Sequence, residues 1–236
     1  MKPDDIDRII EQAAGRIAAH GEDSRVVESV ASALLKDLRP VRPLSPVWLF
    51  SALLVGLFAF FAVLSGSILG LHGIRVLGPL QMAWIFSALL GTATVAAVAS
   101  AHEMRPASGV RFGYFVPVIV NALFLIVFAT LLTGYGMRHF VAEGIPCLVA
   151  GLSVSLPAAV AIALILRRGF VLDWKKAGTV AGTLAGLAGL GMLELHCANL
   201  KAIHVMAWHV AVVIMSGTVG FAIGWTADRF RRRKIF

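Results

Sequence analysis

The chain has 236 residues, of which 58% are apolar and only 14% are charged, and its formal net charge is +8 at pH 7. Soluble globular domains carry about a quarter charged residues, so this composition excludes an ordinary soluble domain and predicts an integral membrane protein. The positive residues cluster at the ends of apolar runs, which indicates membrane topology and argues against direct nucleic-acid binding.

Residues 1–46 are expected to form a small cytoplasmic helical segment with a linker. Apolar residues recur at helical spacing over 4–20 and again to residue 38, with charged residues on the opposite faces. Two such short helices are marginal alone, so their apolar faces need each other, the membrane or a partner protein. The sequence PVRPLSP at 40–46 then predicts an extended, fairly stiff spacer.

Six apolar segments follow, and each approaches the roughly 20 residues that a membrane-spanning helix requires. They lie at about 47–71, 80–101, 113–134, 146–166, 178–194 and 205–227. The predicted fold is an all-α membrane protein with six transmembrane helices in residues 47–228 and a basic cytoplasmic tail at 229–236. Glycines repeated every four residues predict close packing of the fifth and sixth segments, and Pro117 and Pro157 predict bends in the third and fourth.

The distribution of Lys and Arg predicts the orientation of these segments. From Lys36 onward, fourteen such residues lie on the side of the N-terminal segment, and three lie on the other side, namely Arg75, Arg138 and Lys201. By the positive-inside rule both termini are cytoplasmic, and the loops near 72–79, 135–145 and 195–204 are outside. Cys147 and Cys197, the only cysteines, both fall at the outer face.

These two cysteines are the first candidates for function. In an oxidising exterior two thiols at the ends of neighbouring helices can form a disulfide, bind a soft metal ion or stay reduced, and the sequence leaves all three open. Cys197 and His204 are seven residues apart and would share a helix face if the sixth helix began early. With Cys147 and either His196 or His209 they would form a sulfur and nitrogen site of the type that zinc prefers. His209 alone is more typical of a hydrogen-bonded helix histidine.

An enzyme is not expected. His102 and Glu103 begin like the helix of a zinc protease, but Pro106 stands where the second histidine would be. A transporter usually carries intramembrane charges, and the only candidates inside or at the end of a segment are Asn121 and Glu194.

Several stretches together resemble the NrsF-type anti-sigma factors. They are VRPLSP before the first segment, Pro146-Cys147, SLPAAVAIALILRRGF ending the fourth segment, the Gly-rich fifth segment, and His196-Cys197 with Trp208-His209 downstream. The resemblance implies a six-helix protein of the bacterial inner membrane that binds an extracytoplasmic-function sigma factor. It also implies that the two cysteines match the family's cysteine pair and that residues 1–46 match its sigma-binding portion. After Cys197 this chain has Ala198, Asn199 and Lys201, where the family continues with proline and acidic residues.

The sequence therefore predicts a membrane-bound anti-sigma factor that releases its sigma factor when a periplasmic redox or heavy-metal signal reaches Cys147 and Cys197. The expected partners are the sigma factor and the lipid bilayer; no cofactor is required, and a soft metal ion is a candidate ligand of the outer cysteines and histidines. The expected sigma contacts, as helix-in-groove anchors, are Ile6, Ile9, Ile10, Ile17, Val27, Val30 and Leu34. Two alternatives stay open: a small metal transporter that uses His204 and His209, and a structural membrane protein without a sensor role.

Overall fold

The computed structural model describes residues 28–29, 32–33, 46–105 and 113–233. The chain divides into two compact units, 1–43 and 44–236. In the first unit residues 28–29 and 32–33 are helical. All seven expected sigma contacts lie outside the described residues, as does the predicted helix at 4–20. The second unit is a helical bundle, and the described residues contain no strand.

In its described residues the bundle contains six longer helices and two short helical segments. They are α3 (Val47–Leu69), α4 (Pro79–Glu103), α5 (Val116–Leu131), α6 (Phe140–Leu166), α7 (Trp174–His196), α8 (Ala202–His204), the π-helical turn η1 (Val205–His209) and α9 (Val210–Arg233). Five stretches are long and apolar enough to cross a membrane, the last of them running from α8 into α9. The all-α membrane fold is thereby confirmed. The third predicted span corresponds to α5, whose 16 residues are fewer than a span needs.

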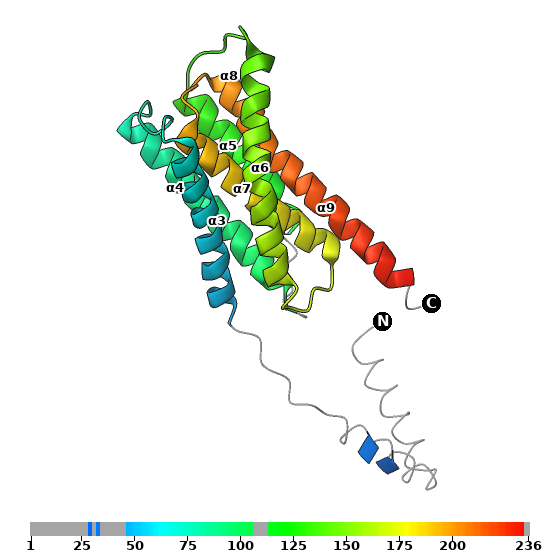
Figure 1. The fold of residues 1–236 in the computed structure, drawn as a ribbon. Helices are drawn as coiled ribbons and strands as arrows, with labels where there is room; N and C mark the ends of the chain where they lie inside the picture. Colours follow the sequence, from blue (N-terminus) through cyan, green and yellow to red (C-terminus); the bar gives the residue numbers. More distant parts are fainter. Residues whose placement is uncertain (1–27, 30–31, 34–45, 106–112, 234–236) are drawn as a thin grey trace, which may run out of the picture. The chain divides into compact units, whose positions relative to one another are not determined.

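Helix α5 is short, but the segments that precede and follow it reach the two opposite ends of the bundle. Before α5, the Tyr114 hydroxyl donates a hydrogen bond to Asp173 Oδ2 at 3.3 Å, next to the start of α7. After α5, the Thr133 carbonyl accepts a hydrogen bond from the Ala202 N–H at 3.3 Å, at the start of α8. The loops before α6 and before α8 therefore meet at one end, where Figure 1 also shows the loop between α3 and α4.

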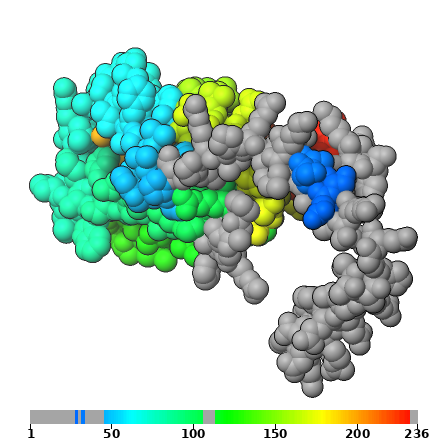
Figure 2. Space-filling view, turned by 90° about the horizontal axis from the view of Figure 1, so that it is seen from below, coloured from blue at the N-terminus to red at the C-terminus, as the bar shows by residue number. Residues whose placement is uncertain are grey.

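Helix α7 is the centre of the bundle. Every residue from Thr179 to Leu195 is buried, and Figure 1 shows α3, α4, α6 and α9 around this helix. The space-filling view in Figure 2 shows blue to cyan atoms of α3 and yellow-green atoms of α6 at the surface. Gly178 of α7 faces Gly220 of α9 so closely that a Cβ on either would collide with the carbonyl oxygen of the other. The predicted close packing of the fifth and sixth segments is confirmed.

Two boundaries differ from the predicted ones. Pro117 is the second residue of α5 and therefore starts that helix, so the predicted bend at this position was wrong. Helix α6 begins at Phe140 and contains both Pro146 and Pro157, although the sequence predicted a start at 146. Tertiary packing holds the extra turns, because the Phe140 ring packs on Trp208 at 5.2 Å. Cys147 consequently lies inside a helix, about two turns after its start.

Candidate functional site: a cluster of two cysteines and two histidines

The two cysteines meet at the end of the bundle where the loop between α3 and α4 lies. Cys147 is on α6, Cys197 is the residue that follows α7, and their Sγ atoms are 3.7 Å apart. Both are free thiols, since a disulfide requires about 2.05 Å between the sulfurs. The hydrogen bond with Cys147, together with burial, raises the pKa of the Cys197 thiol. A cysteine binds a metal ion as the thiolate, so Cys197 would have to give up its proton to bind one.

Two histidines complete the cluster. His204 Nε2 lies 3.7 Å from Cys197 Sγ, and the ligand atoms of Cys147, Cys197, His204 and His209 all lie within 4.8 Å of one another. His204 and His209 are both buried. Where the sequence left a choice between His196 and His209, the structure brings His209 into the cluster.

His196 faces a different neighbour. Its Nδ1 lies 2.9 Å from the Gly70 carbonyl oxygen, and its ring packs edge-on against His72 at 5.6 Å between centroids. His196 therefore belongs to the contact between α7 and the loop that follows α3, and it is not one of the clustered ligands.

A π-helical turn aligns the two clustered histidines. His204 and His209 are five residues apart, and two such residues lie about 140° apart around an α-helix of 3.6 residues per turn. A π-helix joins residues five apart by hydrogen bonds, which brings them onto one face. Here the Val210 N–H donates to the Val205 carbonyl, five residues back. The His204 and His209 rings consequently pack edge-on, with 5.4 Å between centroids.

The predicted reason for the contact between Cys197 and His204 was wrong. The two residues do not share a helix, because Cys197 ends α7 and donates its N–H to the Leu193 carbonyl at 2.7 Å, whereas His204 follows a turn of the chain. The loop between them reverses the chain and places α8 beside the end of α7. Tertiary structure, and not helical spacing, makes this contact.

Glu194 is the site residue that the sequence named as a polar candidate but did not connect with the cysteines and histidines. Its Oε1 lies 2.7 Å from His209 Nδ1, and both side chains are only 1% exposed. The sequence signal was present: a single carboxylate in the apolar end of a segment, three residues before Cys197 and thus on the same side of the helix. Asn121, the other polar candidate, donates from Nδ2 to the Pro117 carbonyl at 2.7 Å within its own helix and is not part of the cluster.

The loop between α3 and α4 is fastened to the end of α7. The N–H groups of Gly73 and Ile74 both donate to the Leu195 carbonyl, at 3.0 and 3.3 Å. A Cβ on Gly73 would lie 2.6 Å from the Glu194 carbonyl oxygen and 2.7 Å from that of Cys197, so only glycine fits at this approach. The end of α3 is thereby connected through one short loop to the backbone that carries Cys197.

The loop after Cys197 is tied to α6. Asn199 donates from Nδ2 to Glu143 Oε2 at 2.8 Å, and Lys201 Nζ lies 3.6 Å from the same oxygen. Exposed ion pairs contribute about 0–1 kcal/mol, so this contact positions the loop more than it stabilises the bundle. Glu143 is one turn before Cys147, and the contact therefore links the two segments that carry the thiols.

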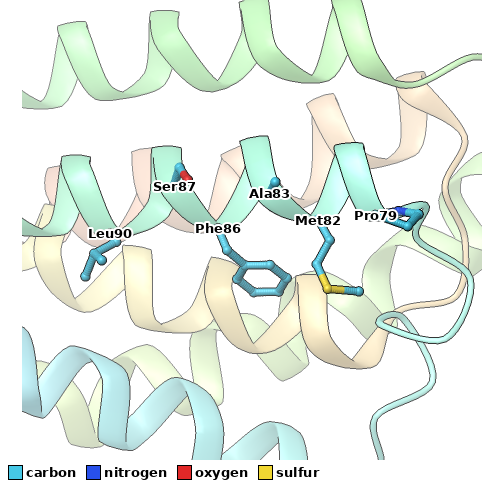
Figure 3. A pocket seen from close by; sticks show the side chains of 6 residues that line it. All are labelled: Pro79, Met82, Ala83, Phe86, Ser87 and Leu90. Carbon is cyan, nitrogen blue, oxygen red and sulfur yellow. The ribbon is translucent and has the colours of Figure 1, made fainter.

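Figure 3 shows a separate hollow on the bundle surface. Its lining comes from α4 and consists of Pro79, Met82, Ala83, Phe86, Ser87 and Leu90. Apart from the Ser87 hydroxyl these side chains are apolar, and none of the candidate residues lines the hollow.

Comparison with known proteins gives one family. The family model described as "Negative regulator of sigma F" (NrsF) matches residues 34–230. The chain has no significant match among curated proteins or solved structures. The matched range includes the whole cluster, but of the expected sigma contacts it includes only Leu34.

Proposed function

Because the chain belongs to the NrsF family of negative regulators of sigma F, we propose that it is an anti-sigma factor of the bacterial inner membrane whose partner is an extracytoplasmic-function sigma factor. The N-terminal helices hold the sigma factor on the cytoplasmic side, and a periplasmic signal at Cys147 and Cys197 releases it. The observation that carries this proposal is the pairing of the only two cysteines of the chain, 50 residues apart in sequence, at 3.7 Å.

The composition of the N-terminal segment supports a protein partner. Residues 1–46 contain eight acidic and seven basic residues, whereas helices that lie on lipid surfaces are usually basic. The apolar residues at helical spacing are typical of helices that insert into a groove of a partner. The Lys and Arg distribution supports the orientation, with both termini in the cytoplasm and the cluster in the periplasmic half.

Either candidate signal would draw the two cysteines together or fix them in place. An oxidant that takes two electrons and two protons from the thiols would leave a disulfide, with the sulfurs about 2.05 Å apart. A soft divalent ion would replace both thiol protons and bind both sulfurs. In each case α6 and the end of α7 are joined, and the effect on sigma affinity is of the order of 1–3 kcal/mol, as for typical allosteric coupling.

The first experiment tests sigma binding. The detergent-solubilised chain should retain one sigma factor of its own organism, and the chain lacking residues 1–40 should not. Ile9→Asp with Ile10→Asp places two charges on the predicted apolar face and should abolish retention while leaving membrane insertion intact, because charges cannot enter an apolar groove. Gln12→Asp with Ala19→Asp adds the same charge to the opposite predicted face and should retain the sigma factor. Normal retention by the Ile9 and Ile10 variant would disprove this interface.

The second experiment tests the cysteines. Cys147→Ser with Cys197→Ser should bind the sigma factor as the unchanged chain does but should no longer release it on addition of a disulfide-forming oxidant or Cd²⁺. The reason is that serine neither forms a disulfide nor binds a soft ion at neutral pH. Sigma release is measured as the fraction eluted from the immobilised chain. Full release from the double variant would show that the signal acts elsewhere.

A further inference from the structure

The buried pair of Glu194 and His209 is not explained by a cysteine pair alone. We propose that Glu194 is a positioning residue that turns His209 Nε2 toward the thiols, so that Cys147, Cys197, His204 and His209 form a closed four-ligand site for a divalent ion of the zinc and cadmium class. This inference rests on the proposed function only for the consequence of binding; the site itself follows from the geometry.

The distances match tetrahedral coordination. With metal–sulfur bonds of about 2.3 Å and metal–nitrogen bonds of about 2.0–2.1 Å, tetrahedral ligands lie about 3.8 Å apart for two sulfurs and about 3.6 Å for a sulfur and a nitrogen. The two sulfurs are 3.7 Å apart, and Cys197 Sγ is 3.7 Å from His204 Nε2. These two pairs need little movement to bind an ion, and all four ligand atoms, which lie within 4.8 Å of one another, would close around it.

The hydrogen bonds of the histidines leave a nitrogen for the ion. His209 Nδ1 lies 2.7 Å from Glu194 Oε1. The buried His209 Nε2 makes no hydrogen bond of good geometry among the described residues, although the ring interacts with the Cys197 thiol. A buried polar nitrogen without a good hydrogen bond is costly, since burial removes its water without replacing it. A metal ion at the centre of the cluster would satisfy it.

Glu194 matches the usual outer partner of a metal-bound histidine. Such histidines almost always give their second ring N–H to a carboxylate, a carbonyl or water, which fixes the tautomer and the ring orientation and raises ligand basicity. Glu194 comes from α7, while His209 comes from η1, so their contact also holds these two segments at a fixed spacing.

The charges favour a divalent ion. Two thiolates balance the charge of a divalent cation. This balance matters because the side chains of the site are largely buried, and an uncompensated buried charge is strongly destabilising. Two sulfur and two nitrogen ligands in a tetrahedron are typical of zinc, and soft thiolates favour cadmium over harder ions such as Mg²⁺. Because four protein ligands fill the tetrahedron, the site is of the structural or sensing kind and leaves no open position for catalysis.

The test is metal binding to the purified full chain, with Co²⁺ as a spectroscopic probe and Zn²⁺ or Cd²⁺ as competitors. One Co²⁺ per chain should bind with the strong visible bands of a tetrahedral ion and with a sulfur-to-metal charge-transfer band. Glu194→Gln should keep this spectrum but weaken binding by about 10- to 100-fold, the usual effect of losing such an outer partner. Glu194→Asp should recover part of the affinity. His209→Ala should alter the tetrahedral spectrum itself.

Asp228→Asn is the matched control, because this carboxylate lies near the end of α9, about five helical turns after His209, and takes no part in the cluster. Its affinity should equal that of the unchanged chain, and thermal unfolding without metal identifies any variant that fails to fold. Equal affinity of the folded Glu194→Gln variant, or an unchanged spectrum in His209→Ala, would overturn the inference. If the unchanged chain binds metal as described but does not release a sigma factor, the site stands and the proposed function fails. If oxidation releases the sigma factor but no metal binds, the proposed function stands and the metal site fails.

Discussion

Replacing Gly220 with alanine should destabilise the bundle by about 1–3 kcal/mol or more, the cost of overpacking a filled interior. The added Cβ would collide with the Gly178 carbonyl oxygen, which belongs to the backbone of α7 and cannot rotate away. The two helices must therefore separate along their seam, where small residues allow close contact in a membrane. The measurement is the unfolding midpoint of the detergent-solubilised chain in a denaturant or thermal series.

Gly91→Ala is the matched control for this substitution. Gly91 lies in the middle of α4, and a Cβ there would meet nothing within 4 Å. Alanine favours a helix over glycine by about 0.5–1 kcal/mol, so the same chemical change should leave the bundle as stable as before or slightly more so. A Gly220→Ala variant that is as stable as Gly91→Ala would contradict the close packing of α7 on α9.

Most of the bundle could be predicted because membrane-spanning helices are long apolar runs that a single sequence shows directly. Long apolar runs predicted six spans, of which five correspond to helices long and apolar enough to cross a membrane. The Gly repeats identified the close contact between α7 and α9, and the Lys and Arg bias grouped the loops that meet at one end. Helix ends were less predictable. The run at 113–134 became a 16-residue helix, and α6 began at Phe140 because packing against Trp208 extends it past Pro146.

The cluster could be predicted only in part. Cysteine and histidine are rare enough here that Cys147, Cys197 and His204 were identified as candidates, but the choice between His196 and His209 depends on a π-helical turn that no periodicity indicates. Glu194 was set aside as terminal, because its partner is 15 residues away on another segment. Contacts of this kind are set by how segments pack, and they leave no pattern in a single sequence.

The second large effect should follow from Gly73→Ala: the chain is expected to bind its sigma factor and to react at the cluster, yet to lose signal-dependent release. The added Cβ would lie 2.6 Å from the Glu194 carbonyl oxygen and 2.7 Å from that of Cys197. The loop must then move away from α7, and its hydrogen bonds from the Gly73 and Ile74 N–H groups to the Leu195 carbonyl are lost. This loop is one direct connection from the cluster to α3, and α3 follows the linker of the proposed sigma-binding segment. We expect the signal to pass through the loop, so a change at the cluster would no longer reach α3.

Two readouts separate lost coupling from a damaged cluster. Thiol labelling of Cys147 and Cys197, or Co²⁺ binding, reports on the cluster and should be close to that of the unchanged chain, because α6, the residue after α7, α8 and η1 supply its side chains. Sigma release reports on coupling and should be abolished.

Gly136→Ala is the control, because this glycine lies in the loop before α6 at the same end and a Cβ there would meet nothing within 4 Å. It should release the sigma factor normally. Coupling requires that the two states of the cluster differ in contacts that the sigma-binding segment experiences. Normal release by a Gly73→Ala variant would therefore show that the signal reaches α3 along the packed faces of α3 and α7, and not through the loop.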